Sequence, residues 1–444
     1  MKLQLVQPTL GKYRTNSRTG CYPPLGLVSI ATHVKRECPS VEVEILDGEM
    51  MPHDEILARL DADIVGLNAN TVTYPQALET AEAAKAAGAV VVLGGVYASA
   101  IPDRILARRS HLFDSVVVGY GEQAMVDIIR GRRDRRIEDQ TAPFLRVPIP
   151  DRSFVEMEDY VETFRESHPT WDYRATNIFT SMGCLWRDKS GGCIFCSRAG
   201  KHTALKPPQL IWNEIRRLKD KYRIDYIVDF SDTLLQDVQW LEALVKAKPD
   251  GLDLHWHVFG RIDEVNPETI SLLRKLPCKH MFVGIESGAP ATFNATRKGG
   301  GSPEASLEMA KRLKQAGIGL TPSYVIGLPG ETKTTLQQTY NHARRLKELT
   351  GFEEIFCCEL IPFPGSPAFR ALNARQPQKG DVFDMQNLKK NWSRQFCKVD
   401  WQSAEKCTSD ILALGKYRIT IKPENHRNLP AAHSPRATEA AVSA

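Results

Sequence analysis

Strand-like apolar runs alternate with helix-like amphipathic runs along this chain, in two successive series. The first series fills residues 1–135, where the strand-like runs are KLQLVQP, VEVEILD, DIVGLNA, AVVVLGG and SVVVGYGE. Apolar strands separated by helices indicate a parallel sheet with helices on both of its faces. The pattern therefore predicts an α/β fold that begins with a doubly wound, Rossmann-like domain, whose ligands bind beyond the carboxyl ends of the strands.

A second series of six strand-like runs, with helix-like runs between them, covers residues 173–365 and follows a proline-rich linker at residues 136–172. Repeated strand–helix units of this kind predict a partial (β/α)6 barrel of the TIM type. Residues 366–423 mix helical and loop patterns, which predicts a small, mostly helical carboxyl-terminal region. Residues 424–444 contain few large apolar side chains, so we expect a disordered tail.

Composition narrows the class of protein. Hydrophobic residues make up 42% of the chain and charged residues 25%, as in soluble globular proteins. The longest apolar stretch, residues 87–101, contains three glycines and is too short to span a membrane. Ten cysteines without regular pairing do not resemble a disulfide framework, so we expect the reducing cytoplasm. The net charge is only +5, and the basic run at residues 130–136 predicts a solvated linker rather than a nucleic-acid contact.

Three cysteines, Cys184, Cys193 and Cys196, follow the first strand of the second series, with gaps of eight and two residues. A cube-shaped iron–sulfur cluster held by three thiolates keeps one iron open for a ligand, whereas an electron-carrying cluster usually takes four. The alternative is a structural zinc ion with His202 as the fourth ligand. Zinc sites more often pair two short knuckles, and only one is present, so the spacing favours the cluster.

The cysteine loop, FVGIESG and YVIGLPGET occur in the order and spacing typical of the radical SAM superfamily, which residues 172–365 resemble. The resemblance implies a [4Fe-4S] cluster whose open iron chelates S-adenosylmethionine (SAM), and cleavage of SAM to a 5′-deoxyadenosyl radical. It also implies an external electron donor of the flavodoxin or ferredoxin type. The chain departs from the common family loop, because LWRDKSGG makes the first gap eight residues long instead of three.

The resemblance also implies roles for side chains that follow the second to fifth barrel strands. Acceptors after the second strand would bind the SAM amine, and an arginine after the third would bind its carboxylate. Residues after the fourth strand would contact the ribose, and glycines after the fifth would admit the adenine. The alternative for each charged residue is a surface ion pair. The predicted residues are Asp229, Ser231, Asp232, Arg261, Glu286, Ser287, Gly327 and Gly330.

The first domain resembles the cobalamin-binding domain that is fused to many radical SAM proteins, through CYPPLGLVSIATHVKR, DIVGLNANTVTYPQAL and SVVVGYGEQA. Glycines at the strand ends would leave room for a large flat ligand, and threonines would donate to its side-chain amides. The predicted contacts are Thr71, Thr73, Gly94, Gly95, Gly119 and Gly121. Many such domains carry a cobalt-binding histidine two residues after an aspartate, but here Glu49 follows Asp47 at that spacing. We therefore expect water, another side chain or nothing as the lower ligand.

Together these patterns predict a cobalamin-dependent radical SAM enzyme that methylates an unactivated carbon of a small molecule. In the scheme that the resemblance implies, the 5′-deoxyadenosyl radical removes a hydrogen atom and the substrate radical takes a methyl group from cobalt. One alternative is a radical rearrangement, cyclisation or decarboxylation without methyl transfer. A second alternative is a non-catalytic zinc-binding protein on the same scaffold.

Overall fold

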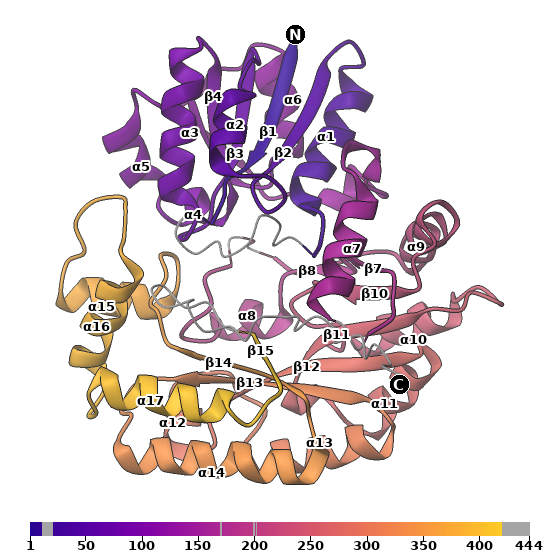
Figure 1. Ribbon diagram of the computed structural model, residues 1–444, viewed down its shortest axis with the longest axis vertical. Helices are drawn as coiled ribbons and strands as arrows, with labels where there is room; N and C mark the ends of the chain where they lie inside the picture. Colours follow the sequence, from indigo (N-terminus) through magenta and orange to yellow (C-terminus); the bar gives the residue numbers. More distant parts are fainter. Residues whose placement is uncertain (11–20, 169–170, 199, 201, 420–444) are drawn as a thin grey trace, which may run out of the picture.

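The computed structural model describes residues 1–10, 21–168, 171–198, 200 and 202–419, which form two stacked α/β units (Figure 1). The amino-terminal unit, indigo to purple in Figure 1, lies above the second unit, which runs from magenta to orange. Each unit has its own parallel sheet, and a small antiparallel sheet pairs β8 (Ser181–Met182) with β9 (Ala204–Leu205). The two series of sequence patterns thus correspond to two separate sheets.

Six parallel strands form the amino-terminal sheet, in the order β2-β1-β3-β4-β5-β6. These strands are β1 (Lys2–Gln7), β2 (Glu42–Asp47), β3 (Ile64–Asn68), β4 (Val90–Gly94), β5 (Ser115–Gly119) and β6 (Arg136–Asp139). The intervening helices are α1 (Leu25–Glu37), α2 (His53–Ala58), α3 (Tyr74–Ala86), α4 (Gly95–Ala100), α5 (Pro102–Arg109) and α6 (Glu122–Ile129). The strand order reverses at β1, so a crevice forms outside the carboxyl ends of β1 and β3. The predicted doubly wound sheet is confirmed.

Strand β6 forms where the sequence predicts the start of the linker. It lies inside residues 136–172, yet it pairs in parallel with β5, with Ile137 opposite Val117. Only Ile137 is buried in this four-residue strand, so no apolar run marks it in the sequence. The amino-terminal sheet therefore extends to Asp139, and the boundary expected at residue 135 is wrong by one strand.

The rest of that segment crosses to the second unit through η2 (Pro143–Leu145), η3 (Arg152–Phe154) and α7 (Met157–Ser167). A buried charged network holds the crossing in place. Arg152 donates to a carboxylate oxygen of Glu214 at 2.9 Å, and Lys206 donates to the other oxygen. Because buried charges are stable only when they are paired, this network fixes the segment against the barrel.

The second sheet is an open, parallel barrel fragment in the order β7-β10-β11-β12-β13-β14-β15. Its strands are β7 (Ala175–Ile178), β10 (Tyr226–Asp229), β11 (His255–Arg261), β12 (Cys278–Glu286), β13 (Gly319–Ile326), β14 (Glu354–Glu359) and β15 (Tyr417–Ile419). Its outer helices are α9 (Pro208–Tyr222), α10 (Val238–Lys246), α11 (Pro267–Lys275), α12 (Pro290–Ala295), α13 (Pro303–Gln315) and α14 (Lys333–Thr350). The six predicted strand–helix units are confirmed, and β15 adds a seventh strand from the carboxyl-terminal region.

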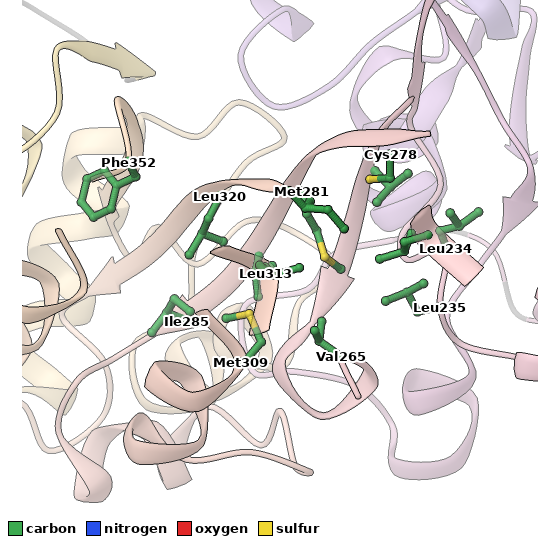
Figure 2. Close-up of a cluster of buried hydrophobic side chains, with 14 of the residues drawn as sticks. Leu234, Leu235, Val265, Cys278, Met281, Ile285, Met309, Leu313, Leu320 and Phe352 are labelled. Atoms are coloured by element: carbon green, nitrogen blue, oxygen red, sulfur yellow. The ribbon is translucent and has the colours of Figure 1, made fainter. Parts of the chain in front are cut away.

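Outward-facing side chains of this sheet form the main hydrophobic core with the surrounding helices. Figure 2 shows part of it, where Met281 of β12 and Leu320 of β13 lie around Leu313 of α13. Cys278 and Cys357 belong to the same core and are buried. The inward-facing side chains of the strands are thereby left to line the interior of the barrel.

The carboxyl-terminal region is mostly helical, as predicted, and packs against both units. Its helices are α15 (Pro367–Arg375), α16 (Met385–Phe396) and α17 (Trp401–Leu412). The loop between α15 and α16 reaches the amino-terminal unit, where Asp381 accepts hydrogen bonds from Tyr74 at 2.9 Å and Arg109 at 2.8 Å. Tyr97 also donates to the Asp381 carbonyl. The tail expected at residues 424–444 lies outside the described residues.

Several predictions from composition can be compared with the structure. No helix in the described ranges is long and apolar enough to cross a bilayer. All ten cysteines are free thiols. The basic run at residues 130–136 meets acidic neighbours, because Arg132 pairs with Asp127 and Asp134, and Arg136 pairs with Asp103. The run is therefore locally neutralised at the surface.

Candidate active site between the two domains

A row of phenylalanine rings crosses the interior of the barrel. The ring centre of Phe230, just after β10, lies 6.2 Å from the ring centre of Phe259 of β11. The ring centre of Phe259 lies 5.1 Å from that of Phe282 of β12. Phe282 in turn lies 6.1 Å from Phe356 of β14. The last three rings line a cavity of about 510 Å³ at the carboxyl ends of the strands. The fold thus places an apolar floor beneath the edge where barrel enzymes carry their chemistry.

All three cysteines of the predicted cluster line this cavity. Cys184 lies two residues after β8 and directly before α8 (Leu185–Ser190), and Gly191 and Gly192 return the chain to Cys193. Both glycines have positive φ (79° and 88°), a conformation that other residues rarely adopt. The insertion in the first gap is therefore a helix with a glycine turn that closes the cysteine loop.

Burial favours the protonated form of two of the three thiols. Burial raises the pKa of Cys193 to about 12. Burial also raises the pKa of Cys184, although the backbone amides of Arg187 and Trp186 donate to its sulfur and oppose the rise. Such thiols lose their protons only to a cation that stabilises the thiolates. Three thiols on one wall of a cavity, with free space beside them, fit a cluster that keeps one iron open.

The zinc alternative needs a fourth ligand beside the three cysteines. In the described part of the chain no three His, Cys, Asp or Glu side chains are already gathered around a single point, and this holds for the three cysteines as well. His202, the proposed fourth zinc ligand, is exposed to solvent.

The structure separates the three residues predicted after the second barrel strand. Asp229 is 1% exposed and accepts hydrogen bonds from Thr180 and Ser231, so it ties the ends of β7 and β10 together. Ser231 is buried in the same network, and neither residue lines the cavity. Asp232 does line the cavity and pairs with Arg198 at 2.8 Å. Of the three, only Asp232 is placed to meet a ligand.

Arg261 and Glu286 line the cavity as predicted, and each already has a partner. The Arg261 guanidinium donates to both carboxylate oxygens of Asp263 and to the Lys298 carbonyl, and it lies 5.0 Å from the Trp186 ring. Glu286 accepts a 2.6 Å hydrogen bond from the Lys298 ammonium. Lys298 was missed from the sequence, because a lysine in a glycine-rich loop carries no motif of its own.

Ser287, Gly327 and Gly330 do not line the cavity. Ser287 is buried and hydrogen-bonds with Thr292 and Thr339, behind the sheet. Gly327 and Gly330 both have a φ of 80°, so a tight turn after β13 requires glycine there. Their predicted part in binding SAM is replaced in this geometry by a role in the turn.

A second cavity, of about 310 Å³, lies over the carboxyl edge of the amino-terminal sheet and continues between the sheet and helices α1 and α6. Among the described residues, its lining includes the four glycines predicted for cobalamin (Gly94, Gly95, Gly119 and Gly121), two more from the amino-terminal unit (Gly26 and Gly66) and two beside the cysteines (Gly183 and Gly200). A Cβ on Gly66 would lie 2.9 Å from Met125, and one on Gly121 would lie 2.7 Å from Ile30. Side chains at these positions would fill the slot, so the lining fits a large ligand with a narrow extension, as cobalamin has.

Other predicted cobalamin contacts are not brought to this cavity. Thr73 is buried and accepts from the Asn70 backbone amide, and Thr71 does not line the cavity either. Asp47 accepts a 2.6 Å hydrogen bond from Tyr160, and the Glu49 amide donates to Asp47. The described residues that line the cavity include no histidine, consistent with the missing cobalt-binding histidine.

The two cavities meet. Arg187, Arg198 and Asp232 line both of them, so the cavity at the cysteines and the cavity at the glycine-rich strand ends adjoin at these three side chains. Ligands bound in the two cavities would therefore face each other across a short junction.

Comparison with known proteins agrees with this geometry. The model of the B12 binding domain matches residues 11–129, and the model of the Radical SAM superfamily matches residues 178–343. An uncharacterized methyltransferase, PH0819 of Pyrococcus horikoshii, is 27% identical over 379 residues, 78% of each chain. The bacteriochlorophyllide d C-12(1)-methyltransferase of Chlorobaculum tepidum is 23% identical and covers 84% of this chain and 79% of its own length. An anaerobic magnesium-protoporphyrin IX monomethyl ester cyclase of Rubrivivax gelatinosus is 24% identical and covers 83% of this chain and 68% of its own.

Among solved structures, the radical S-adenosylmethionine methyltransferase TsrM from Kitasatospora setae, with cobalamin and a [4Fe-4S] cluster bound, has the same fold. The TM-score is 0.69 at 17% identity, and the match covers 93% of this chain and 90% of TsrM. The arrangement of a doubly wound domain above an open barrel is thus shared over nearly the whole chain.

Proposed function

We propose that this chain, which belongs to the radical SAM superfamily and has an amino-terminal B12-binding domain, is a cobalamin-dependent C-methyltransferase of a small molecule. One observation carries the proposal. The cavity at the cluster cysteines and the glycine-lined cavity of the B12-binding domain share Arg187, Arg198 and Asp232. A methyl group carried on one side of this junction is within reach of a carbon activated on the other side.

Residues that line the two cavities would hold the cluster, SAM and cobalamin. Cys184, Cys193 and Cys196 would hold the cluster, and Asp232 and Glu286 would accept hydrogen bonds from SAM. When bound, the cluster supplies the electron that cleaves SAM, and cobalamin supplies the methyl group. An external flavodoxin- or ferredoxin-type protein would provide that electron. The free thiols suit the reducing cytoplasm, which we propose as its location.

The chain's own contribution is to orient these groups and to exclude water. The phenylalanine rings close the cavity from below, and the amino-terminal domain covers it from above. Val72, from the loop before α3, lines the cavity at the cysteines, so both domains contribute side chains to its lining. Exclusion of water protects reactive intermediates and keeps the reacting groups close together.

Anaerobic purification, reconstitution with iron, sulfide and cobalamin, and metal analysis test the proposal. We expect about four irons per chain, bound cobalamin, and formation of 5′-deoxyadenosine from SAM. The Cys196→Ala variant should lose the cluster and SAM cleavage, whereas Cys38→Ala, which changes a thiol remote from the cavity, should keep both. Zinc without iron would contradict the proposal.

The cyclase relative supports a second candidate function, in which the radical enzyme transforms its substrate without methyl transfer. This candidate predicts consumption of SAM and formation of 5′-deoxyadenosine without a methylated product. Mass spectrometry of products formed with methyl-labelled SAM distinguishes the two functions.

A further inference from the structure

The helix α8, which fills the insertion between the first two cluster cysteines, is held from several sides. The Leu185 amide donates to Gln236 at 3.0 Å, and the Trp186 indole donates to the Arg297 carbonyl at 2.9 Å. Asp188 accepts a 2.7 Å hydrogen bond from the Thr203 amide. A loop that served only to space the cysteines would need none of these contacts, so the orientation of α8 is fixed.

One side chain of this helix, Arg187, has no comparable partner. Both of its Nη atoms are buried, and neither has a hydrogen-bond partner among the residues that the structure describes. Its nearest carboxylate is Asp188, 4.0 Å from Nε. Gly192 leaves room for the Arg187 stem, because a Cβ there would lie 2.9 Å from Cγ. The guanidinium is therefore positioned, buried and unsatisfied at the junction of the two cavities.

The other arginine at the junction, Arg198, and Arg261 in the cavity at the cysteines already have partners. Arg198 pairs with Asp232, and Arg261 pairs with Asp263. A buried guanidinium without hydrogen bonds is costly, because the group has lost its water without replacement. A planar guanidinium with free N–H groups can donate two parallel hydrogen bonds to the two oxygens of a carboxylate. The unsatisfied group at the junction therefore points to an anionic ligand.

We propose that Arg187 binds a carboxylate of the methyl-acceptor substrate, which would be a small carboxylic acid with an apolar or aromatic body. This inference rests on the proposed function, which places the acceptor between the two cofactors. The body would lie on the rings of Phe259, Phe282 and Phe356. The methionyl end of SAM carries the same chemical group, so it is the rival source of the carboxylate.

A pair of matched probes tests the proposal without knowledge of the natural substrate. The probes are 3-phenylpropionate and 3-phenylpropanamide, which differ in the carboxylate. Their dissociation constants are measured by anaerobic equilibrium dialysis on the cluster- and cobalamin-loaded protein saturated with SAM. We expect the acid to bind roughly ten- to a hundredfold more tightly than the amide, the range for a charge-assisted bidentate contact.

Variants of Arg187 test whether its guanidinium causes the preference for the acid over the amide. Arg187→Met should reduce the preference for the acid to less than about twofold. Arg187→Lys, which keeps the positive charge but not the planar guanidinium, should retain part of the preference. Lys189→Met is the matched control, because it removes an exposed charge from the same helix, and it should keep the full preference. Equal binding of acid and amide by the unmodified protein, or no binding of either, overturns the proposal.

A second arm separates the two sources of the carboxylate. The affinity for SAM alone should change by less than about twofold in Arg187→Met. A tenfold loss of SAM affinity would assign the Arg187 guanidinium to the methionyl carboxylate and overturn the substrate assignment. Because these readouts are binding constants, a failure of methyl transfer with the acid preference intact would count against the proposed function alone.

Discussion

Asp229 and Asp232 stand three residues apart and have the same side chain, yet the fold gives them different environments. Asp229 is enclosed by hydroxyl and amide donors, whereas Asp232 faces the cavity and one arginine. A sequence pattern identifies both as polar residues at a strand end, and only packing distinguishes them. The cluster cysteines were found from the sequence because their spacing is itself the signal. Arg187 and Lys298 were missed because their roles come from where loops fold.

Asp229→Asn should lower the free energy of unfolding by roughly 2 kcal/mol. The asparagine side chain would point an N–H group at the N–H and O–H groups of Thr180 and Ser231, which now donate to the carboxylate. Asp232→Asn should change the free energy of unfolding by less than about 1 kcal/mol, since it removes one ion pair whose arginine is more than half exposed. Urea denaturation under anaerobic conditions measures both. SAM affinity should fall in Asp232→Asn, and an unfolding free energy for Asp229→Asn equal to that of the unmodified protein would refute the structural role of Asp229.

Glu122, at the start of α6, gives a prediction that depends on pH. Burial raises the pKa of Glu122, whose carboxyl accepts a 2.7 Å hydrogen bond from Ser29. Glu122 also lines the glycine-lined cavity of the amino-terminal domain. The folded state therefore keeps the proton to a higher pH than the unfolded state. The resulting stabilisation is complete below the unfolded pKa, near 4.5, and is lost as pH rises through the folded pKa.

The Glu122→Gln variant, which mimics the protonated acid, should match the unmodified protein near pH 4.5. At pH 8 it should be more stable than the unmodified protein, which has to bury an ionised carboxylate there. Chemical denaturation at the two pH values measures the difference. Glu242→Gln, which alters an exposed acid on α10, should show no such dependence on pH.

At the scale of elements, strands with long apolar runs were predictable, and short edge strands were not. β6 has one buried side chain, and β15 is three residues long, so the pairing of each depends on its neighbour rather than on its own pattern. The inserted loop was predicted as polar and glycine-rich, but not as the helix α8. That helix forms where Trp186 is held between Arg261 and the Arg297 carbonyl.

Trp186→Ala should loosen the cysteine loop, because it removes one hydrogen bond and one cation–π contact. Together these are worth about 1–2 kcal/mol. We expect the reconstituted protein to lose iron to a chelator roughly tenfold faster, if release follows local opening of the loop. Tyr222→Ala removes a cation–π contact with Lys221 on α9, where neither residue lines the cavity, and should leave the rate unchanged.

On the scale of the whole molecule, the position of the amino-terminal domain depends on contacts between segments far apart in the chain. Asp381, after α15, binds Tyr74 and Arg109 of the amino-terminal domain and is buried. No local pattern predicts this contact, because its partners are separated by about three hundred residues. The doubly wound sheet and the barrel were each predictable, and their mutual placement was not.

Asp381→Asn should weaken the docking of the two domains by about 2 kcal/mol, because the half-buried Arg109 loses its counter-charge. Differential scanning calorimetry should then resolve two unfolding transitions in place of one. Asp410→Asn, on the exposed face of α17, should keep a single transition. A single unshifted transition in Asp381→Asn would contradict the role of this contact.

If the two domains hold cobalamin and SAM side by side, a methyl group should pass from SAM to cobalamin on this protein. Anaerobic incubation of the reconstituted protein with a reductant and SAM bearing a trideuterated methyl group tests this transfer directly. Mass spectrometry of the cobalamin recovered from the protein then shows whether the label has moved. We expect cobalamin that carries the trideuterated methyl group. Unlabelled cobalamin, from a protein that binds it and cleaves SAM, would contradict the proposed function.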